Sequence, residues 1–79
     1  MTNIEKYNSA FIKTFSANEI ELGQGFQAGL VKNWDSIRHL SLITVLEDEF
    51  DIMFDSEDLL GLRSYEIGKQ ILSKYGVEV

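Results

Sequence analysis

Ser36 is the residue whose type and setting point most clearly to chemistry. It belongs to the segment Trp-Asp-Ser-Ile-Arg-His at residues 34–39, where a polar loop gives way to an apolar stretch with helical spacing. The segment therefore places an acid and then a serine hydroxyl at the predicted start of a helix. Ser36 has no obvious activating base, which argues against a hydrolase nucleophile. Its hydroxyl is instead a candidate attachment point for a group that another enzyme installs.

The residues around Ser36 resemble an acyl carrier protein. The resemblance rests on the Asp35-Ser36-Ile37 step, on the Leu-Glu-x-x-Phe-x-Ile ending at residues 46–52, and on the spacing between them. In that family the serine carries 4′-phosphopantetheine through a phosphodiester, and the thiol of this arm holds acyl groups as thioesters. The resemblance implies that a phosphopantetheinyl transferase, using coenzyme A and Mg²⁺, modifies Ser36. It also implies a tethering carrier of fatty-acid, polyketide or related biosynthesis, and not an enzyme.

The same resemblance assigns roles to other residues. Asp35 matches the acid that precedes the attachment serine. The implied partners are the transferase and acyl-loading and acyl-processing enzymes with basic docking surfaces. Positions that meet these partners are matched by Ile37, Leu40, Ser41, Thr44, Glu47 and Asp48. Interior positions that can border an acyl-chain cavity are matched by Leu42, Leu46 and Phe50.

Four residues depart from the pattern of fatty-acid carriers. Trp34 stands where many of them have a small residue, and Ile37 replaces the commoner leucine. Arg38 and Ser41 stand where acids are frequent. The start of the second helix is therefore less acidic than in fatty-acid carriers, and the pattern is more similar to a stand-alone carrier of a specialised pathway.

The start of a helix is physically suited to hold a phosphodiester. Its unpaired N–H groups and partial positive charge stabilise a negative charge. Asp35 or Ser36 can act as the N-cap of this helix, and Asp35 can orient the Ser36 hydroxyl or the backbone around it. A serine that only caps the helix is the simpler interpretation of an isolated Asp-Ser-Ile step.

Hydrophobic spacing predicts an all-α fold, a small four-helix bundle with three longer helices, one short helix and a long first loop. The predicted helices cover residues 3–15, 36–49, 57–61 and 65–75. The loop covers residues 16–35, and its apolar side chains should pin parts of it to the core. Asp55 or Ser56 is expected to cap the third helix, and Ser64 the last one.

The second helix has apolar side chains on more than one side. One stripe, assigned to the core, contains His39, Leu42, Ile43, Leu46 and Phe50. The other stripe begins beside Ser36 and contains the partner-binding positions. Further residues expected in the core are Trp34, Met53, Phe54, Tyr65, Ile67, Ile71, Leu72 and Tyr75. His39 is expected to be a half-buried core residue, because no second histidine or cysteine could form a catalytic pair with it.

The net charge of −6 narrows the choice of partners. Nucleic acid and anionic membrane surfaces are disfavoured, since binding them needs an excess of lysine and arginine. Seven of the thirteen acids lie within residues 47–58. This acidic segment is either a solvated surface or a docking surface, and basic protein surfaces are its natural partners.

The 79 residues allow one domain, residues 1–79. There is no cysteine and a single histidine, so we expect no disulfide and no metal site, and a thiol would have to come from a prosthetic group. No apolar run approaches the ~20 residues of a membrane span, and the N-terminus lacks a secretion-signal pattern. We therefore expect a monomer in the cytoplasm, without membrane insertion.

Three alternatives differ in how well the residues support them. An aminoacyl or peptidyl carrier would share the fold and the attachment site, and the residues do not separate it from an acyl carrier. An unmodified acidic helical interaction module would use the acids near Glu47 and Asp48 and would not need Ser36. An enzyme is the weakest alternative, because the chain offers no nucleophile–base pair. The acid-rich segment also lacks the glycine and ligand spacing of an EF-hand.

Overall fold

Four α-helices, in the predicted order, make up the fold of the computed structural model, which describes residues 2–23 and 25–79. Their bounds are Asn3–Phe15 for α1, Ser36–Phe50 for α2, Ser56–Gly61 for α3 and Tyr65–Lys74 for α4. The long first loop contains one 3-10 turn, η1 (Glu19–Glu21). The all-α prediction is confirmed, and each predicted helix boundary lies within one residue of the observed one. In the described part of the chain no helix has the length and apolarity to cross a membrane.

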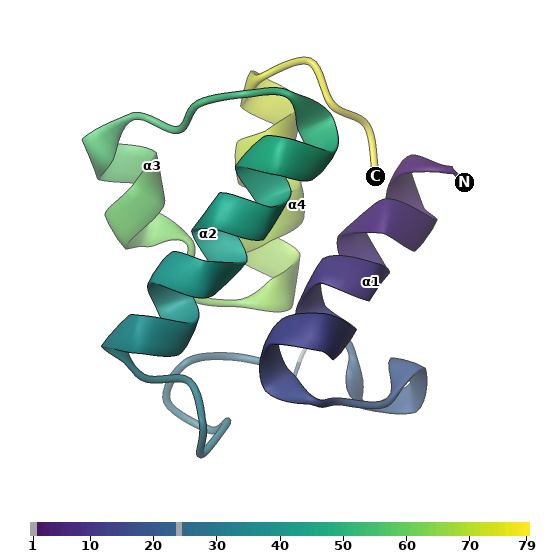
Figure 1. Cartoon of the computed structure of the whole chain (residues 1–79), viewed down its shortest axis with the longest axis vertical. Helices are drawn as coiled ribbons and strands as arrows, with labels where there is room; N and C mark the ends of the chain where they lie inside the picture. The colour runs from purple at the N-terminus through teal and green to yellow at the C-terminus, as the bar shows by residue number, and fades with distance from the viewer. Residues whose placement is uncertain (1, 24) are drawn as a thin grey trace.

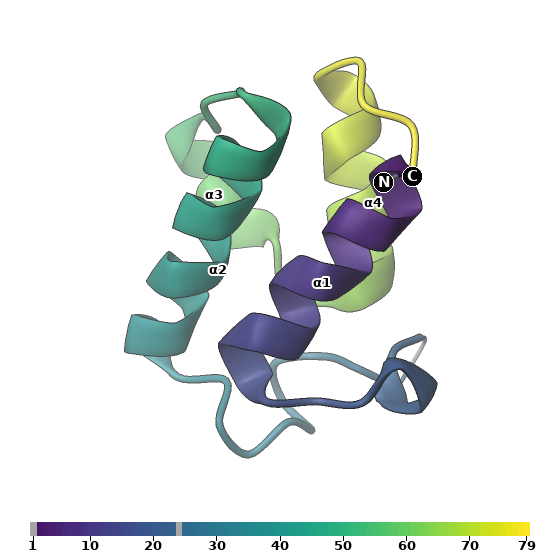
Figure 2. The same ribbon diagram turned by 45° about the vertical axis from the view of Figure 1, so that its right-hand side comes forward.

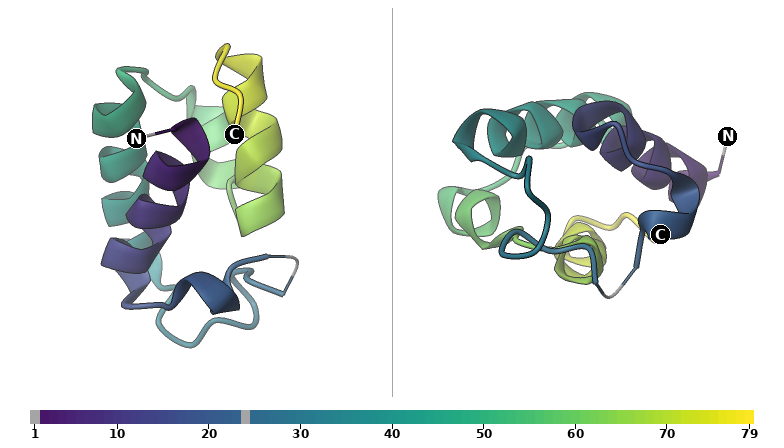
Figure 3. Two further views of the ribbon diagram at one scale, coloured as in Figure 1. Left: turned by 90° about the vertical axis from the view of Figure 1, so that its right-hand side faces the viewer. Right: turned by 90° about the horizontal axis from the view of Figure 1, so that it is seen from below.

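The three longer helices stand side by side, and the short α3 lies beside α2 (Figure 1, Figure 2). The long loop runs across one end of the bundle, below the end of α1 and the starts of α2 and α4 (Figure 3). Two backbone hydrogen bonds attach the loop to the connection between α3 and α4. Ala28 N donates to Arg63 O at 2.8 Å, and Tyr65 N donates to Phe26 O at 2.9 Å.

Capping side chains mark the starts of α1 and α4, whereas at α3 the N-cap residue is Asp55, as predicted, but its side chain makes no capping hydrogen bond. Thr2 and Glu5 form a capping box at α1, with each side chain bound to the other residue's backbone N–H. Ser64 caps α4, as predicted, by accepting from Ile67 N at 3.0 Å. Asn33 caps the other end of α1, because its side-chain amide donates to Phe15 O at 2.9 Å. These side chains satisfy backbone groups that a helix end leaves without a partner.

Phe11 of α1 is the centre of the core. Its ring lies 4.9–6.0 Å, centroid to centroid, from the rings of Tyr7, Phe15, Phe26, Trp34 and Tyr65. Such aromatic pairs stabilise a core beyond the area they bury. The cluster joins α1, the middle and the end of the loop and the start of α4, and it confirms Trp34 as a packing residue. Within the loop Phe26 is buried, whereas Ile20 and Leu30 are exposed.

Two residues predicted to be in the core are exposed. Met53 is 82 % exposed and Ile67 is 41 % exposed. Met53 lies in an extended segment after the helix, where alternate side chains point to opposite sides, so its neighbour Phe54 is the one that is buried. Ile67 lies off the face of α4 that faces the core, which is formed by Tyr65, Gly68, Ile71 and Leu72.

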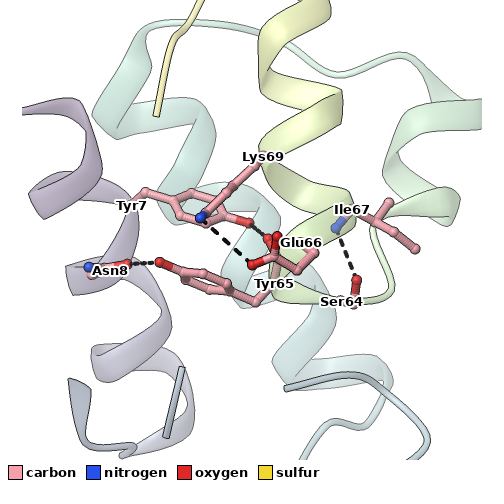
Figure 4. Close-up of polar contacts among 7 residues, drawn as sticks. All are labelled: Tyr7, Asn8, Ser64, Tyr65, Glu66, Ile67 and Lys69. Atoms are coloured by element: carbon pink, nitrogen blue, oxygen red, sulfur yellow. Dashed lines mark hydrogen bonds and ion pairs between the residues drawn. The ribbon is translucent and has the colours of Figure 1, made fainter. Parts of the chain in front are cut away.

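The contact between α1 and α4 has no room for a side chain at Gly68. The buried Tyr7 hydroxyl donates to the carbonyl oxygen of Tyr65, and the Tyr65 hydroxyl donates to Asn8 Oδ1 (Figure 4). A Cβ atom on Gly68 would stand 2.1 Å from the Tyr7 hydroxyl oxygen. Burial raises the pKa of Tyr7, which keeps this hydroxyl protonated as a donor. Gly68 is therefore needed because the Tyr7 hydroxyl of α1 occupies the space that a side chain would take.

Gly68→Ala is expected to lower the free energy of unfolding by about 1–3 kcal/mol, because the new methyl group overlaps the Tyr7 hydroxyl. Tyr7→Phe removes that hydroxyl, so the glycine substitution should cost less in the Tyr7→Phe background. Urea denaturation of the wild type, both single variants and the double variant measures this coupling.

Gly61→Ala is the matched control, since nothing lies within 4 Å of a Cβ built there. Its stability should change by no more than about 1 kcal/mol. Equal losses from Gly68→Ala with and without the Tyr7 hydroxyl would show that the overlap is not the cause.

Candidate functional site

Ser36 is the first residue of α2, and it is exposed. The N-cap is Asp35, whose Oδ1 accepts from Arg38 N at 2.8 Å. The Ser36 hydroxyl makes no hydrogen bond to another described residue. Asp35 thus does the capping that either residue could have done, and the interpretation of Ser36 as a plain N-cap serine is wrong. The hydroxyl is left exposed on the first turn of the helix.

The chain contains a second Asp-Ser step at a helix start, Asp55-Ser56. Comparing the two helix starts shows how the surroundings of Ser36 differ from those of Ser56. The first turn of α2 contains no acid, whereas the first turn of α3 contains Glu57 and Asp58. An anion added to Ser56 would be repelled by those carboxylates. The longer α2, with 15 residues against 6 for α3, also provides the larger helix dipole at its start. Ser36 is therefore the better place for a negatively charged group.

Two hydrogen bonds through His39 tie together the segments that meet beside Ser36. Trp34 Nε1, at the end of the loop, donates to His39 Nδ1 at 3.1 Å. His39 Nε2 lies 2.7 Å from Leu59 O of α3. Because Nδ1 accepts, the proton of the neutral ring is assigned to Nε2, which donates to Leu59 O. The ring thereby satisfies a carbonyl that the end of a short helix leaves without a partner.

These contacts determine what His39 can do. The residue is 7 % exposed, so its predicted place in the core is confirmed, and it is buried where a half-buried side chain was expected. Both ring nitrogens are engaged, so neither is available to take a proton from Ser36. His39 therefore positions the loop, α2 and α3, and no described side chain accepts a hydrogen bond from the Ser36 hydroxyl.

A groove of about 440 Å³ lies next to Ser36. Ser36 and Asp35 line it together with the apolar residues Leu40, Leu59 and Leu60 and with Arg63. Residues from α2 and from α3 and its end thus form one concave surface. The groove offers apolar contacts, the positive charge of Arg63 and the carboxylate of Asp35 beside an exposed hydroxyl.

A second, more open groove of about 480 Å³ follows the exposed face of α2. It is lined by four of the predicted partner-binding residues and Val45, namely Ile37, Leu40, Ser41, Thr44 and Val45. Ile37 is 77 % exposed and Leu40 is 55 % exposed, so this helix presents large apolar side chains to solvent. These two side chains, exposed on one helix face, make that face a candidate contact surface.

The two acids assigned to partner binding differ from each other. Asp48 is exposed at the end of α2. Glu47 is half-buried, and its Oε2 accepts from Phe54 N at 2.9 Å. The Glu47 carboxylate therefore holds the chain after α2 in place, a role that the sequence pattern did not indicate.

The three residues expected to border an acyl-chain cavity lie in the interior and not in the surface grooves. Leu42 and Leu46 are fully buried, and Phe50 is half-buried. None of the three lines either groove beside Ser36. The groove next to Ser36 is thus lined by residues other than the three that were expected to border an acyl-chain cavity.

Asp58 holds α3 against the end of α4, and sequence reasoning missed this role. Lys74 Nζ donates to Asp58 Oδ1 at 2.6 Å, and the Tyr75 hydroxyl donates to Asp58 Oδ2 at 2.7 Å. The same Tyr75 oxygen accepts from Asp55 N at 2.9 Å. Hydrogen bonds from Lys74 and then Tyr75 lower the pKa of Asp58 from its ordinary value of 3.8. No local pattern could reveal this contact, because the partners are 16 and 17 residues apart.

No protein family model, no curated protein and no solved structure matches this chain. Within residues 2–23 and 25–79 no group of three or more histidine, cysteine or acidic side chains is placed to hold a metal ion. The function is therefore inferred from the residues and geometry around Ser36.

Asp35→Ala is expected to lower the free energy of unfolding by about 0.5–2 kcal/mol, because it removes the cap of α2. Ser36→Ala should change it by less than about 0.5 kcal/mol, because the serine hydroxyl makes no hydrogen bond within the described part of the chain. Urea denaturation of the two variants makes the comparison. The reverse order of stabilities would make Ser36 the cap and remove the argument for its free hydroxyl.

The contribution of Asp58 to stability is expected to disappear in acid. Its pKa is lower in the folded state than in the unfolded state, so the stabilisation is fully present above the unfolded value and is lost as the pH falls through the folded value. The difference in melting temperature between wild type and Asp58→Asn should be largest at neutral pH and should shrink below pH 3.8. Asp48→Asn, at an exposed site, is the control and should show no such change.

Proposed function

We propose that this protein is an acyl carrier that holds acyl groups as thioesters on 4′-phosphopantetheine attached to Ser36. The observation that carries the proposal is the exposed Ser36 hydroxyl on the first turn of α2, left unbonded because Asp35 caps the helix. This position agrees with the attachment serine of the carrier family that residues 34–39 resemble. The proposed pathway class is fatty-acid, polyketide or related biosynthesis.

The residues around Ser36 fit a phosphodiester. The start of α2 supplies N–H groups and the positive end of the helix dipole, and its first turn contains no acid. Arg63 adds a positive charge in the same groove. When bound, the arm supplies a thiol, which this cysteine-free chain lacks.

Attachment requires a separate enzyme, because no described side chain accepts a hydrogen bond from the Ser36 hydroxyl and so could activate it. In the proposed step Ser36 Oγ forms a bond to the phosphorus on the pantetheine side of the coenzyme A diphosphate. The bond to the other phosphate breaks, and adenosine 3′,5′-bisphosphate leaves with the electron pair. The Ser36 proton passes to a base of the phosphopantetheinyl transferase, whose Mg²⁺ would neutralise the diphosphate charge.

The exposed face of α2 supports the proposed docking of partner enzymes. Ile37 and Leu40 offer apolar contacts one turn or less from Ser36, and Asp48 offers a charge at the far end of the helix. A partner with an apolar patch and a basic border would complement this face. The net charge of −6 would speed the encounter with such a partner.

The proposed carrier works as a monomer in the cytoplasm. The absence of cysteine is compatible with a reducing compartment. In that setting the transferase and coenzyme A would both reach Ser36.

Intact-mass spectrometry tests the proposal directly. After incubation with coenzyme A, Mg²⁺ and a transferase of broad specificity, the wild type should gain the mass of one phosphopantetheinyl group. Ser36→Ala should gain nothing. Ser56→Ala is the matched control, because it alters the other Asp-Ser step at a helix start and should be modified like the wild type.

Two outcomes would contradict the carrier function. One is a wild type that stays unmodified with several transferases, which would favour an unmodified interaction module. The other is modification that persists in Ser36→Ala.

A further inference from the structure

Arg63 is a cation in the groove that contains Ser36. It follows the end of α3 and lines the groove together with Ser36, Leu59 and Leu60. The other arginine near the site, Arg38, lies on the first turn of α2 but does not line this groove. Arg38 can therefore serve as a control for Arg63, because it has the same charge but lies outside the groove.

The backbone of Arg63 is held in place on both sides. Its N–H donates to Gly61 O at 2.8 Å, and its carbonyl oxygen accepts from Ala28 N at 2.8 Å. The second of these bonds ties Arg63 to the long loop. Its position relative to Ser36 is thus a consequence of the fold, even though the side chain is exposed.

The Arg63 guanidinium group forms no ion pair within 4.0 Å with a described acid. The described residues contain two ion pairs within 4.0 Å, and these involve Lys69 and Lys74. Asp35 also lines the groove; its Oδ1 accepts from the backbone Arg38 N, and no ion pair within 4.0 Å joins it to Arg63 among the described residues. An arginine remains protonated at all relevant pH values, so Arg63 contributes a permanent positive charge to a groove that also contains the Asp35 carboxylate.

We propose that Arg63 holds the negative charge of the phosphodiester on Ser36 and so directs the arm along the groove between α2 and α3. This inference rests on the proposed function. The guanidinium group matches a phosphate in charge and in hydrogen-bonding geometry. Leu40, Leu59 and Leu60 then form the apolar wall against which the arm lies.

The expected strength of this contact suits a carrier. An exposed ion pair shifts an equilibrium by about two- to fivefold, so the arm favours the groove but leaves it readily. A partner enzyme can therefore withdraw the arm without breaking a strong interaction. Arg63 acts in this way as a positioning residue, and the competing view is an arginine whose stem covers apolar surface while its charge stays in water.

The test compares amide NMR spectra before and after attachment in the wild type, Arg63→Gln, Arg63→Lys and Arg38→Gln. Intact mass first confirms that each sample is modified, and circular dichroism confirms that each unmodified variant is folded. In the wild type, attachment should shift the Leu59 and Leu60 amides, and the shifts should weaken in about 1 M salt, where charges are screened over a few Å. Arg63→Gln should abolish these shifts, Arg63→Lys should restore part of them, and Arg38→Gln should keep them.

The outcomes separate the two proposals. A modified wild type whose Leu59 and Leu60 shifts persist in Arg63→Gln would overturn the role of Arg63 and leave the carrier function intact. Equal losses in Arg63→Gln and Arg38→Gln would also overturn it, because the effect would then be general charge. A wild type that cannot be modified would overturn both the carrier function and the role of Arg63.

Discussion

The chain of hydrogen bonds from Trp34 through His39 to Leu59 is the constraint on which the site depends. It connects the end of the long loop, the second turn of α2 and the end of α3. The imidazole can serve both neighbours only as the neutral ring with its proton on Nε2. Because the ring is buried, either lost bond would leave a polar group without a partner, which is costly. The surroundings of Ser36 are thus built by a residue that takes no part in its chemistry.

The aromatic cluster around Phe11 holds Trp34, the first residue of this series of hydrogen bonds, in place. Phe26 and Trp34 both belong to the loop and both pack on Phe11, so the loop has a fixed course across the end of the bundle. The bonds from Ala28 and Tyr65 hold the middle of the loop to the connection after α3. The long loop therefore acts as a structural element that supports the start of α2.

Much of the fold could be predicted from local patterns, and the errors have identifiable causes. Helical spacing and capping residues predict the four helices within one residue at each boundary. Apolar character predicts that Met53 and Ile67 lie in the core, but their exposure depends on which way an extended segment or a helix face is turned. The sequence does not distinguish Asp58 from the acids around it, since its partners Lys74 and Tyr75 lie at the end of another helix.

The sequence by itself determined the positions of the helices and the presence of an Asp-Ser step at the start of α2, because spacing and capping are properties of neighbouring residues. It left open which of Asp35 and Ser36 caps the helix, and it assigned no role to Arg63. Only the tertiary structure decided these points. The loop fixes the direction from which the chain enters α2, and packing of α3 against α2 creates the groove that Ser36 and Arg63 share. Contacts between distant segments depend on the whole fold, and no local pattern encodes them.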